Sequence, residues 1–130
     1  MKRIRFAGAL DDAVVRESVA HASLLVLPSL YEGFGLPALE AMAAGCPVAA
    51  ARITALIEIC GEAAHYFDPL DVRDMAQTIL RMLGDDTLRQ HLILKGLDRA
   101  LQFSWEAGSN ALGALIVEML APKADGERRH

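Results

Sequence analysis

Two carboxylates, Glu32 and Glu40, bracket a glycine-rich turn in the first third of the chain. The turn contains Gly33 and Gly35, which have no Cβ atom and therefore let a ligand approach the backbone closely. Ionised carboxylates accept hydrogen bonds and repel phosphate, so they suit the hydroxyl groups of a sugar. The spacing predicts a turn that binds alcohols on both sides of its centre.

The centre of the turn suits an anion. Pro37 fits the first turn of a helix, because its missing N–H would have no partner there, and Gly45 is typical of a helix end. The free amides of residues 35–39, the proline excepted, and the positive end of the helix dipole favour a phosphate. One helical turn rises about 5.4 Å, which is comparable to the span of a diphosphate. We therefore predict a nucleotide sugar, although the turn is neither a G-x-G-x-x-G sequence nor a P-loop.

Each of these residues also has a purely structural explanation. Glu40 would be favoured by the helix dipole as an exposed acid of the first helical turn, whatever it binds. Glu32 would be a plain loop carboxylate. None of His21, His65 and His91 has a nearby Ser and Asp partner in the sequence, so the histidines do not indicate a catalytic triad.

Short apolar runs alternate with helical patterns, which is typical of strand–helix units on a parallel sheet. The run Leu24–Leu27, which ends at Pro28, predicts a strand buried on both faces. The other expected strands are Ile4–Phe6, Pro47–Ala51 and Ala64–Phe67. The expected helices are Ala13–Ala22 capped by Asp11 or Asp12, Pro37–Ala44, Ala55–Cys60, Val72–Leu83 capped by Asp71, Asp86–Phe103, and Trp105 to about Leu120 capped by Ser104.

These elements predict an α/β fold, with a Rossmann-like parallel sheet, flanking helices and a helical C-terminal third. One domain is expected over residues 1–121, followed by a flexible tail over residues 122–130. In the helix Val72–Leu83, four residues follow the spacing of a core-facing stripe, namely Met75, Ile79, Met82 and Leu83.

Composition excludes several classes of protein. The 13 Lys and Arg against 17 Asp and Glu give a net charge of −4, which argues against a general nucleic-acid binder. No apolar run approaches the roughly 20 residues of a membrane span, and the basic N-terminus lacks the apolar region of a signal peptide. Cys46 and Cys60 have no C-x-x-C partner, which predicts two reduced, buried thiols in a cytoplasmic protein rather than a disulfide or a metal site.

The segment Pro28–Pro47 resembles the E-x7-E signature of family 4 retaining nucleotide-sugar glycosyltransferases, which have the two-Rossmann-domain GT-B architecture. Residues 30–37, Leu-Tyr-Glu-Gly-Phe-Gly-Leu-Pro, are especially similar to mannosyltransferase-like members, many of which use GDP-mannose. The similarity covers most of the chain and continues through Pro47–Ala50, Glu58–Ala64, Tyr66–Pro69 and Phe103–Glu106.

The resemblance implies a role for each residue of the turn. Glu32 would be the catalytic residue, contacting hydroxyls of the transferred sugar near the reacting carbon, and Glu40 would accept hydrogen bonds from the ribose. Such enzymes transfer a hexose with retention of configuration from a GDP- or UDP-linked donor to a glycan or lipid acceptor. The resemblance implies no cofactor and no metal, since dipoles and basic side chains stabilise the leaving diphosphate. The implied donor-binding set is Gly33, Phe34, Gly35, Leu36 and Glu40.

The resemblance also implies parts that lie outside this chain. The chain begins near what resembles the third strand of the second domain, so an N-terminal acceptor domain or a partner chain would complete the enzyme. The strands before it normally deliver an Arg and a Lys that bind the diphosphate. Arg52 is either a substitute for them or a solvated loop arginine. We expect the chain to supply the donor-binding half and to be inactive alone.

A competing hypothesis is a non-catalytic Rossmann-like module that oligomerises or binds a partner and keeps a vestigial donor site. In the sheet order 3-2-1-4-5-6 the absent strands are central, so Leu24–Leu27 would be an unpaired apolar edge. We expect Ile4–Phe6 to pair with this edge, or two chains to form a homodimer through it.

Overall fold

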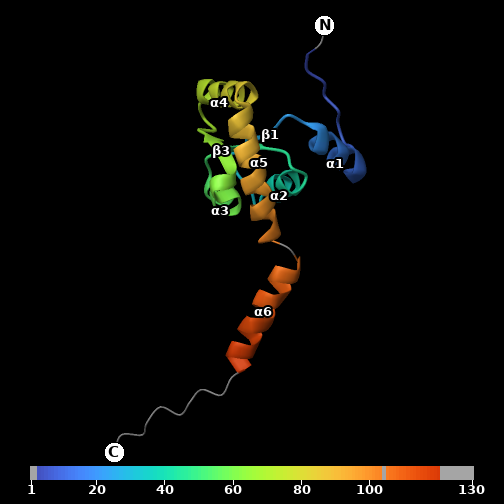
Figure 1. The fold of residues 1–130 in the computed structure, drawn as a ribbon, viewed down its shortest axis with the longest axis vertical. Coiled ribbons are helices and arrows are strands. Elements are labelled where there is room, and N and C mark those ends of the chain that lie inside the picture. The colour runs from blue at the N-terminus through green and yellow to red at the C-terminus, as the bar shows by residue number, and fades with distance from the viewer. Residues whose placement is uncertain (1–2, 104, 121–130) are drawn as a thin grey trace, which may run out of the picture.

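The computed structural model describes residues 3–103 and 105–120, and its centre is a parallel sheet in the order β1-β2-β3 (Figure 1). The strands are β1 (Leu25–Leu27), β2 (Val48–Ala51) and β3 (Ala64–Phe67). The helices are α1 (Asp12–His21), α2 (Leu36–Ala43), α3 (Thr54–Cys60), α4 (Val72–Gly84), α5 (Asp86–Leu101) and α6 (Trp105–Leu120), with a 3-10 turn at Gly61–Ala63. The expected α/β fold with a helical C-terminal third is confirmed.

Strand β2 is the middle strand of this sheet. Val48 lies opposite Leu25 of β1 and opposite Ala64 of β3, so the three strands are in parallel register. All four residues of β2 are fully buried. A strand covered on both faces is expected to be apolar throughout, which explains the run from Val48 to Ala51.

Two glycines with positive φ fix the bounds of α2. Gly35 precedes the helix at φ +83°, and Gly45 follows it at φ +74°. Residues with a side chain rarely adopt this left-handed conformation, so glycines at these positions define where the helix begins and ends. Pro37 lies in the first turn, as predicted.

The core lies between the sheet and the helices, and its largest fully buried side chains include Phe67, Met42, Leu56 and Met82. Helix α5 packs along α2, with Gly96 directly against Met42. Burying a side chain of this size stabilises the fold by about 1.5–3 kcal/mol. The core therefore holds α2, and the turn that precedes it, firmly against the sheet.

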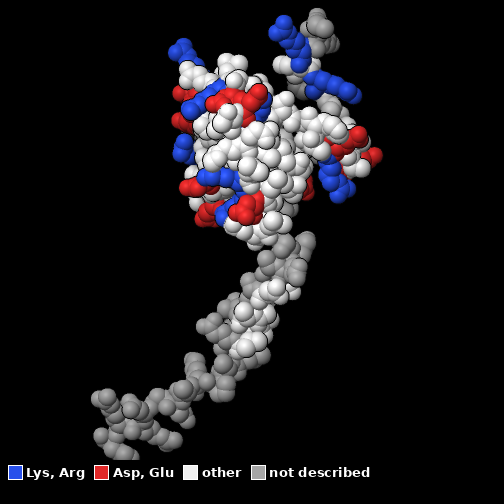
Figure 2. Space-filling model, in the orientation of Figure 1, with Lys and Arg blue, Asp and Glu red and all other residues white. Residues whose placement is uncertain are grey.

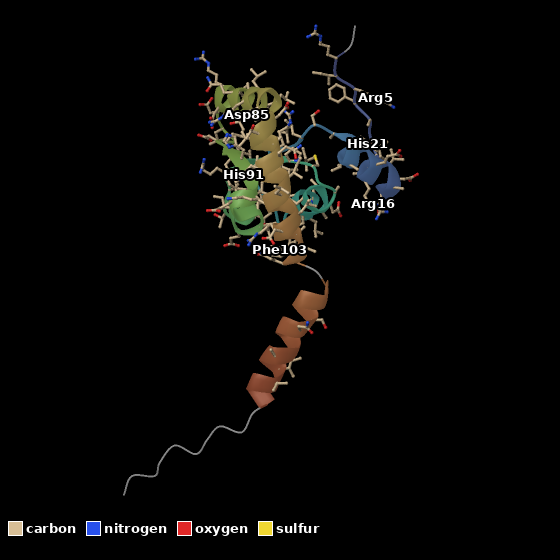
Figure 3. All side chains as sticks on the ribbon, viewed as in Figure 1. Arg5, Arg16, His21, Asp85, His91 and Phe103 are labelled. Atoms are coloured by element: carbon tan, nitrogen blue, oxygen red, sulfur yellow. The ribbon has the colours of Figure 1, made fainter. Side chains whose placement is uncertain are left out.

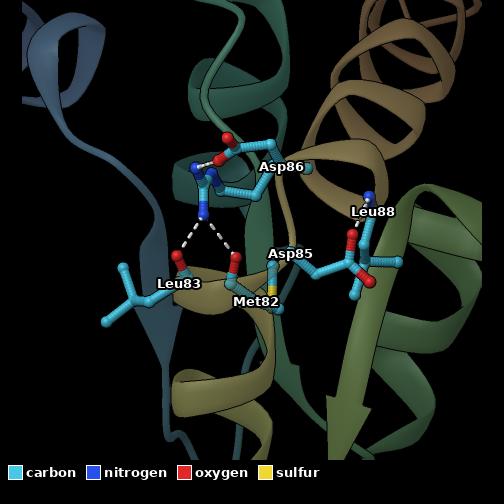
Figure 4. Close-up of polar contacts among 6 residues, drawn as sticks. Met82, Leu83, Asp85, Asp86 and Leu88 are labelled. Carbon is cyan, nitrogen blue, oxygen red and sulfur yellow. Dashed lines mark hydrogen bonds and ion pairs between the residues drawn. The ribbon is translucent and has the colours of Figure 1, made fainter.

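The corner between α4 and α5 is closed by Arg89 (Figure 4). Its guanidinium donates to the carbonyl oxygens of Met82 and Leu83, each at 2.6 Å, and forms an ion pair with Asp86. The Asp85 carboxylate accepts from the amide of Leu88 at 2.9 Å and caps α5. Asp71 caps α4 in the same way, as predicted, by accepting from the amides of residues 73 and 74.

The prediction of a strand at Ile4–Phe6 is wrong. This segment forms no ladder, Ile4 is 73% exposed and Phe6 is 95% exposed. The segment that carries Arg5 runs away from the sheet (Figure 3), so its expected pairing with β1 is also wrong. Its alternating sequence suits a strand, but a strand forms only when its backbone groups pair with a neighbour, and this segment does not lie along the open edge of β1.

Strand β1 is half-buried, in contrast to the prediction that it is covered on both faces. The reason is its place at the edge of the described sheet. In α4, Met82 is buried as predicted, and Met75 and Ile79 are partly buried, whereas Leu83 is 47% exposed and does not belong to the core stripe. Leu83 stands one position past Met82, which turns it away from the sheet.

Other expectations have mixed outcomes. Cys46 and Cys60 are free and buried, as predicted. Asp11 precedes α1, but its side chain makes no capping hydrogen bond. The predicted cap Ser104 and the tail 122–130 lie outside the described residues.

Helix α6 lies apart from the sheet and from α1–α5 in Figure 1. On the face drawn in Figure 2, acidic and basic side chains are interspersed.

Candidate functional site

The predicted turn leads from the carboxyl end of β1 into α2. Gly35 is buried, and a Cβ atom placed on it would lie 3.2 Å from Cδ2 of Leu56. A side chain at this position would therefore be excluded both by φ +83° and by contact with α3. This residue sets the path of the backbone from residue 33 to residue 36.

The free amides of the turn lie earlier than predicted. The amides of Ala38 and Leu39 both donate to the carbonyl of Gly35, at 3.0 Å and 3.4 Å, so the first helical turn already uses two of the expected donors. The amides of Gly33, Phe34, Gly35 and Leu36 have no backbone partner among the described residues. The amides left without a backbone partner in this turn are therefore those of residues 33–36 rather than 35–39, and they lie at the positive end of the helix dipole.

Glu32 is half-buried and oriented by its neighbour Ser29. The Ser29 hydroxyl donates to Oε1 of Glu32 at 2.8 Å, which leaves Oε2 to accept from another group. Glu32 lines a hollow of about 610 Å³, together with Arg52, Thr54 and Glu58. Because these residues follow β1 and β2, the hollow lies at the carboxyl ends of the strands, where open α/β sheets bind their ligands.

Glu40 is exposed and lies in a different hollow, between α1 and α2. This second hollow measures about 470 Å³ and is lined mainly by apolar side chains, including Val15, Val19 and Leu25, beside Arg16 and Glu40. Arg16 is visible on α1 in Figure 3. Glu32 and Glu40 thus border separate hollows, with the free amides of the turn between them in the chain.

The other two residues of the predicted set are exposed hydrophobics. Phe34 is 51% exposed and Leu36 is 57% exposed. The Phe34 ring packs edge-to-face against the Phe103 ring at a centroid distance of 6.4 Å. The Arg99 guanidinium lies over the Phe103 ring, 5.0 Å from its centroid. The turn is therefore anchored to the end of α5, which Figure 3 labels at Phe103.

The sequence left open whether Arg52 binds a ligand or is a solvated loop arginine. Its guanidinium lies 5.6 Å from the ring centroid of Tyr66, and its backbone amide donates to the Phe67 carbonyl at 2.8 Å. The Tyr66 hydroxyl donates to the Gly61 carbonyl at 2.6 Å, and burial raises the pKa of Tyr66 to about 12. The sequence feature that marks Arg52 as a candidate ligand-binding residue is its position directly after an apolar strand.

The described residues hold no cluster of three or more His, Cys, Asp or Glu side chains arranged for a metal ion. Burial lowers the pKa of His65, and the charges of Arg81 and Arg52 lower it further against the opposing effect of Asp74. No described helix has the length and hydropathy that a membrane crossing requires.

Comparison with known proteins shows the family of this chain. The family model described as glycosyl transferases group 1 matches residues 1–85, and the chain belongs to this family. The chain is 45% identical over 103 residues to the O-antigen chain mannosyltransferase B of Escherichia coli, covering 79% of this chain and 27% of that protein. It is 37% identical over 130 residues to the D-inositol 3-phosphate glycosyltransferase of Corynebacterium efficiens, covering 96% and 30%.

A solved structure shares the fold. The sucrose-phosphate synthase of Thermosynechococcus elongatus, a GT-B glycosyltransferase, superposes with a TM-score of 0.79 at 34% identity, over 93% of this chain and 31% of that one. The chain thus spans between about a quarter and a third of the length of these three proteins.

Proposed function

We propose that this chain carries the donor-binding part of a retaining glycosyltransferase, which transfers a hexose from a nucleotide-diphosphate sugar to a glycan or lipid acceptor. The observation that carries the proposal is the turn between β1 and α2. Four successive amides, from Gly33 to Leu36, have no backbone partner among the described residues and precede a helix. Such amides bind phosphate groups, and Glu32 stands beside them with one carboxylate oxygen not used by Ser29.

Mannose is the sugar we propose, with GDP-mannose as the donor. The support is the printed activity of the relatives, since the O-antigen chain mannosyltransferase B of Escherichia coli and the MMP alpha-(1->4)-mannosyltransferase of Mycolicibacterium hassiacum align over 79% and 80% of this chain. In this proposal Glu32 binds sugar hydroxyls, Gly33–Leu36 bind the diphosphate and Glu40 binds the ribose. No metal takes part.

Turnover requires more than these residues in our proposal. The chain spans 27% of the Escherichia coli mannosyltransferase, so we expect donor binding without transfer by this polypeptide alone. A further domain or a partner chain would bring the acceptor, and the edge of β1 is where a strand of that partner or of a second copy would pair. The buried free thiols of Cys46 and Cys60 support a reducing, cytoplasmic location.

The test is a titration of the full chain with GDP, UDP, GDP-mannose and UDP-glucose, followed by backbone amide chemical shifts. We expect shifts concentrated at Gly33–Glu40 and a preference for the guanine nucleotides. Glu32→Gln should reduce the difference in affinity between GDP-mannose and GDP, while the matched surface variant Glu17→Gln should preserve it. No response to any nucleotide at millimolar concentration would contradict the proposal and favour a non-catalytic partner-binding module.

A further inference from the structure

Two opposite charges face the hollow at the carboxyl ends of β1 and β2 without forming an ion pair. Glu32 and Arg52 both line this space of about 610 Å³. The ion pairs found among the described residues are Arg89–Asp86 and Lys95–Glu62. The guanidinium and the carboxylate therefore remain available to a ligand that enters between them.

Arg52 is held in place before any ligand arrives. The hydrogen bond from its backbone amide to the Phe67 carbonyl continues the pairing of β2 with β3 by one residue, so the sheet fixes its backbone. Its guanidinium lies 5.6 Å from the centroid of the Tyr66 ring, and the Tyr66 hydroxyl is in turn bound to Gly61. Stacking on an aromatic ring leaves the edge N–H groups of a guanidinium free to donate.

The remaining lining residues define what the hollow accepts. Glu32 and Glu58 accept hydrogen bonds from alcohols, and the Thr54 hydroxyl both donates and accepts. A phosphate alone would be repelled by the two carboxylates, and a neutral sugar alone would leave Arg52 without a partner. The complementary ligand has several hydroxyls and one anionic group.

We propose that Arg52 is the anion-binding residue of this hollow and that the hollow takes a phosphorylated carbohydrate, with sugar hydroxyls at Glu32 and phosphate at Arg52. This inference rests on the proposed function and deepens it, because it assigns the phosphate a side-chain partner directly after β2, in addition to the amides that precede α2. The phosphate belongs either to the donor or to a phosphorylated acceptor, since both place an anion beside a sugar.

The experiment compares α-mannose 1-phosphate with mannose in titrations of the full chain, monitored by amide shifts at residues 30–32 and 52–58. Wild type should bind the phosphorylated sugar at least about tenfold more tightly, as expected for a hydrogen bond between two charged groups. Arg52→Ala should abolish this preference and leave mannose binding unchanged. Arg52→Lys should restore part of it, because lysine keeps the charge without the planar fork. The control Arg73→Ala removes an exposed cation of α4 that lines no part of this hollow.

Equal losses for Arg52→Ala and Arg73→Ala would overturn the inference, because they would indicate general electrostatic attraction. GDP-mannose binding at Gly33–Glu40 that is unaffected by Arg52→Ala, with no preference for mannose 1-phosphate, would overturn the role of Arg52 and leave the proposed function intact. A preference that depends on Arg52 supports the inference, even if no nucleotide binds and the proposed function fails. Competition by GDP-mannose would assign the phosphate to the donor, and simultaneous binding would assign it to an acceptor.

Discussion

Gly96 of α5 lies directly against Met42 of α2. A Cβ atom on Gly96 would lie 3.1 Å from Cγ and 3.3 Å from Cβ of Met42, a side chain that is only 1% exposed. The close approach of these two helices holds α2 in place, and the turn that carries the candidate site is continuous with α2. The stability of the helix pair and the shape of the site are therefore linked.

The variant Gly96→Ala should lower the free energy of unfolding by about 1 kcal/mol. The alanine gains up to about 1 kcal/mol in helix propensity, but overpacking against Met42 costs about 1–3 kcal/mol. Gly84→Ala is the matched control, because a Cβ on Gly84 at the end of α4 meets no atom within 4 Å. Urea denaturation followed by circular dichroism measures both. A Gly96→Ala protein at least as stable as wild type would show that α2 and α5 separate easily.

Arg99 should contribute more to stability than the other surface arginines. Its Nε donates to the Ile59 carbonyl at 2.8 Å and a terminal nitrogen donates to the Glu58 carbonyl at 2.6 Å, at the end of α3. Arg99→Ala leaves both carbonyls without this donor and should cost about 2 kcal/mol. Arg73→Ala should remain within about 0.5 kcal/mol of wild type. Thermal denaturation of the two variants measures the difference, and similar melting temperatures would contradict the stabilising role of Arg99.

His65 should make the protein less stable in mild acid. Its pKa in the folded chain is lowered from 6.5, by burial first and then by Arg81 and Arg52, so the unfolded chain binds the proton more readily. The free energy of unfolding then falls as the pH decreases through about 6.5. His65→Gln should reduce the loss of unfolding free energy between pH 7 and pH 5. Each protein is compared with its own stability at pH 8, where the imidazole is neutral in both states. Identical slopes for wild type and variant would refute the expectation.

Glu40 should discriminate ribose from deoxyribose. A carboxylate that accepts hydrogen bonds from ribose hydroxyls makes wild type prefer GDP over 2′-deoxy-GDP, by about tenfold for one hydrogen bond to a charged group. Glu40→Gln should reduce this preference, whereas Glu17→Gln on α1 should not alter it. Calorimetric titration of the two nucleotides measures the ratio. A ratio that is unchanged in Glu40→Gln would remove Glu40 from the site.

The sequence predicted those parts of the fold that depend on local conformational preferences. Pro37 and Gly45 predicted α2, and Asp71 predicted the cap of α4, because each acts within one turn of its own position. Ile4–Phe6 was expected to be a strand on the same kind of evidence, and this was wrong, because pairing with β1 depends on the path of the chain through α1, which local preferences do not decide. The half-burial of β1 likewise depends on what lies beside it.

The sequence supplied the candidate residues of the site, whereas their geometry was only partly predictable. The acids and glycines of the turn are evident in the sequence, whereas the engagement of the Ala38 and Leu39 amides by the Gly35 carbonyl depends on how the helix begins. That Glu32 and Arg52 line one hollow follows from the parallel pairing of β1 with β2. The bond from Arg99 to α3 spans 40 residues and has no sequence signature.

Three of the four residues in the middle strand are alanines, and Ala38 and Ala41 of the helix beside it are equally inaccessible to solvent. Small side chains permit close spacing of adjacent layers, but they leave no slack to absorb a larger group. Change of the sequence during evolution should therefore be confined to the periphery, with these methyl groups retained wherever the neighbouring loops diverge.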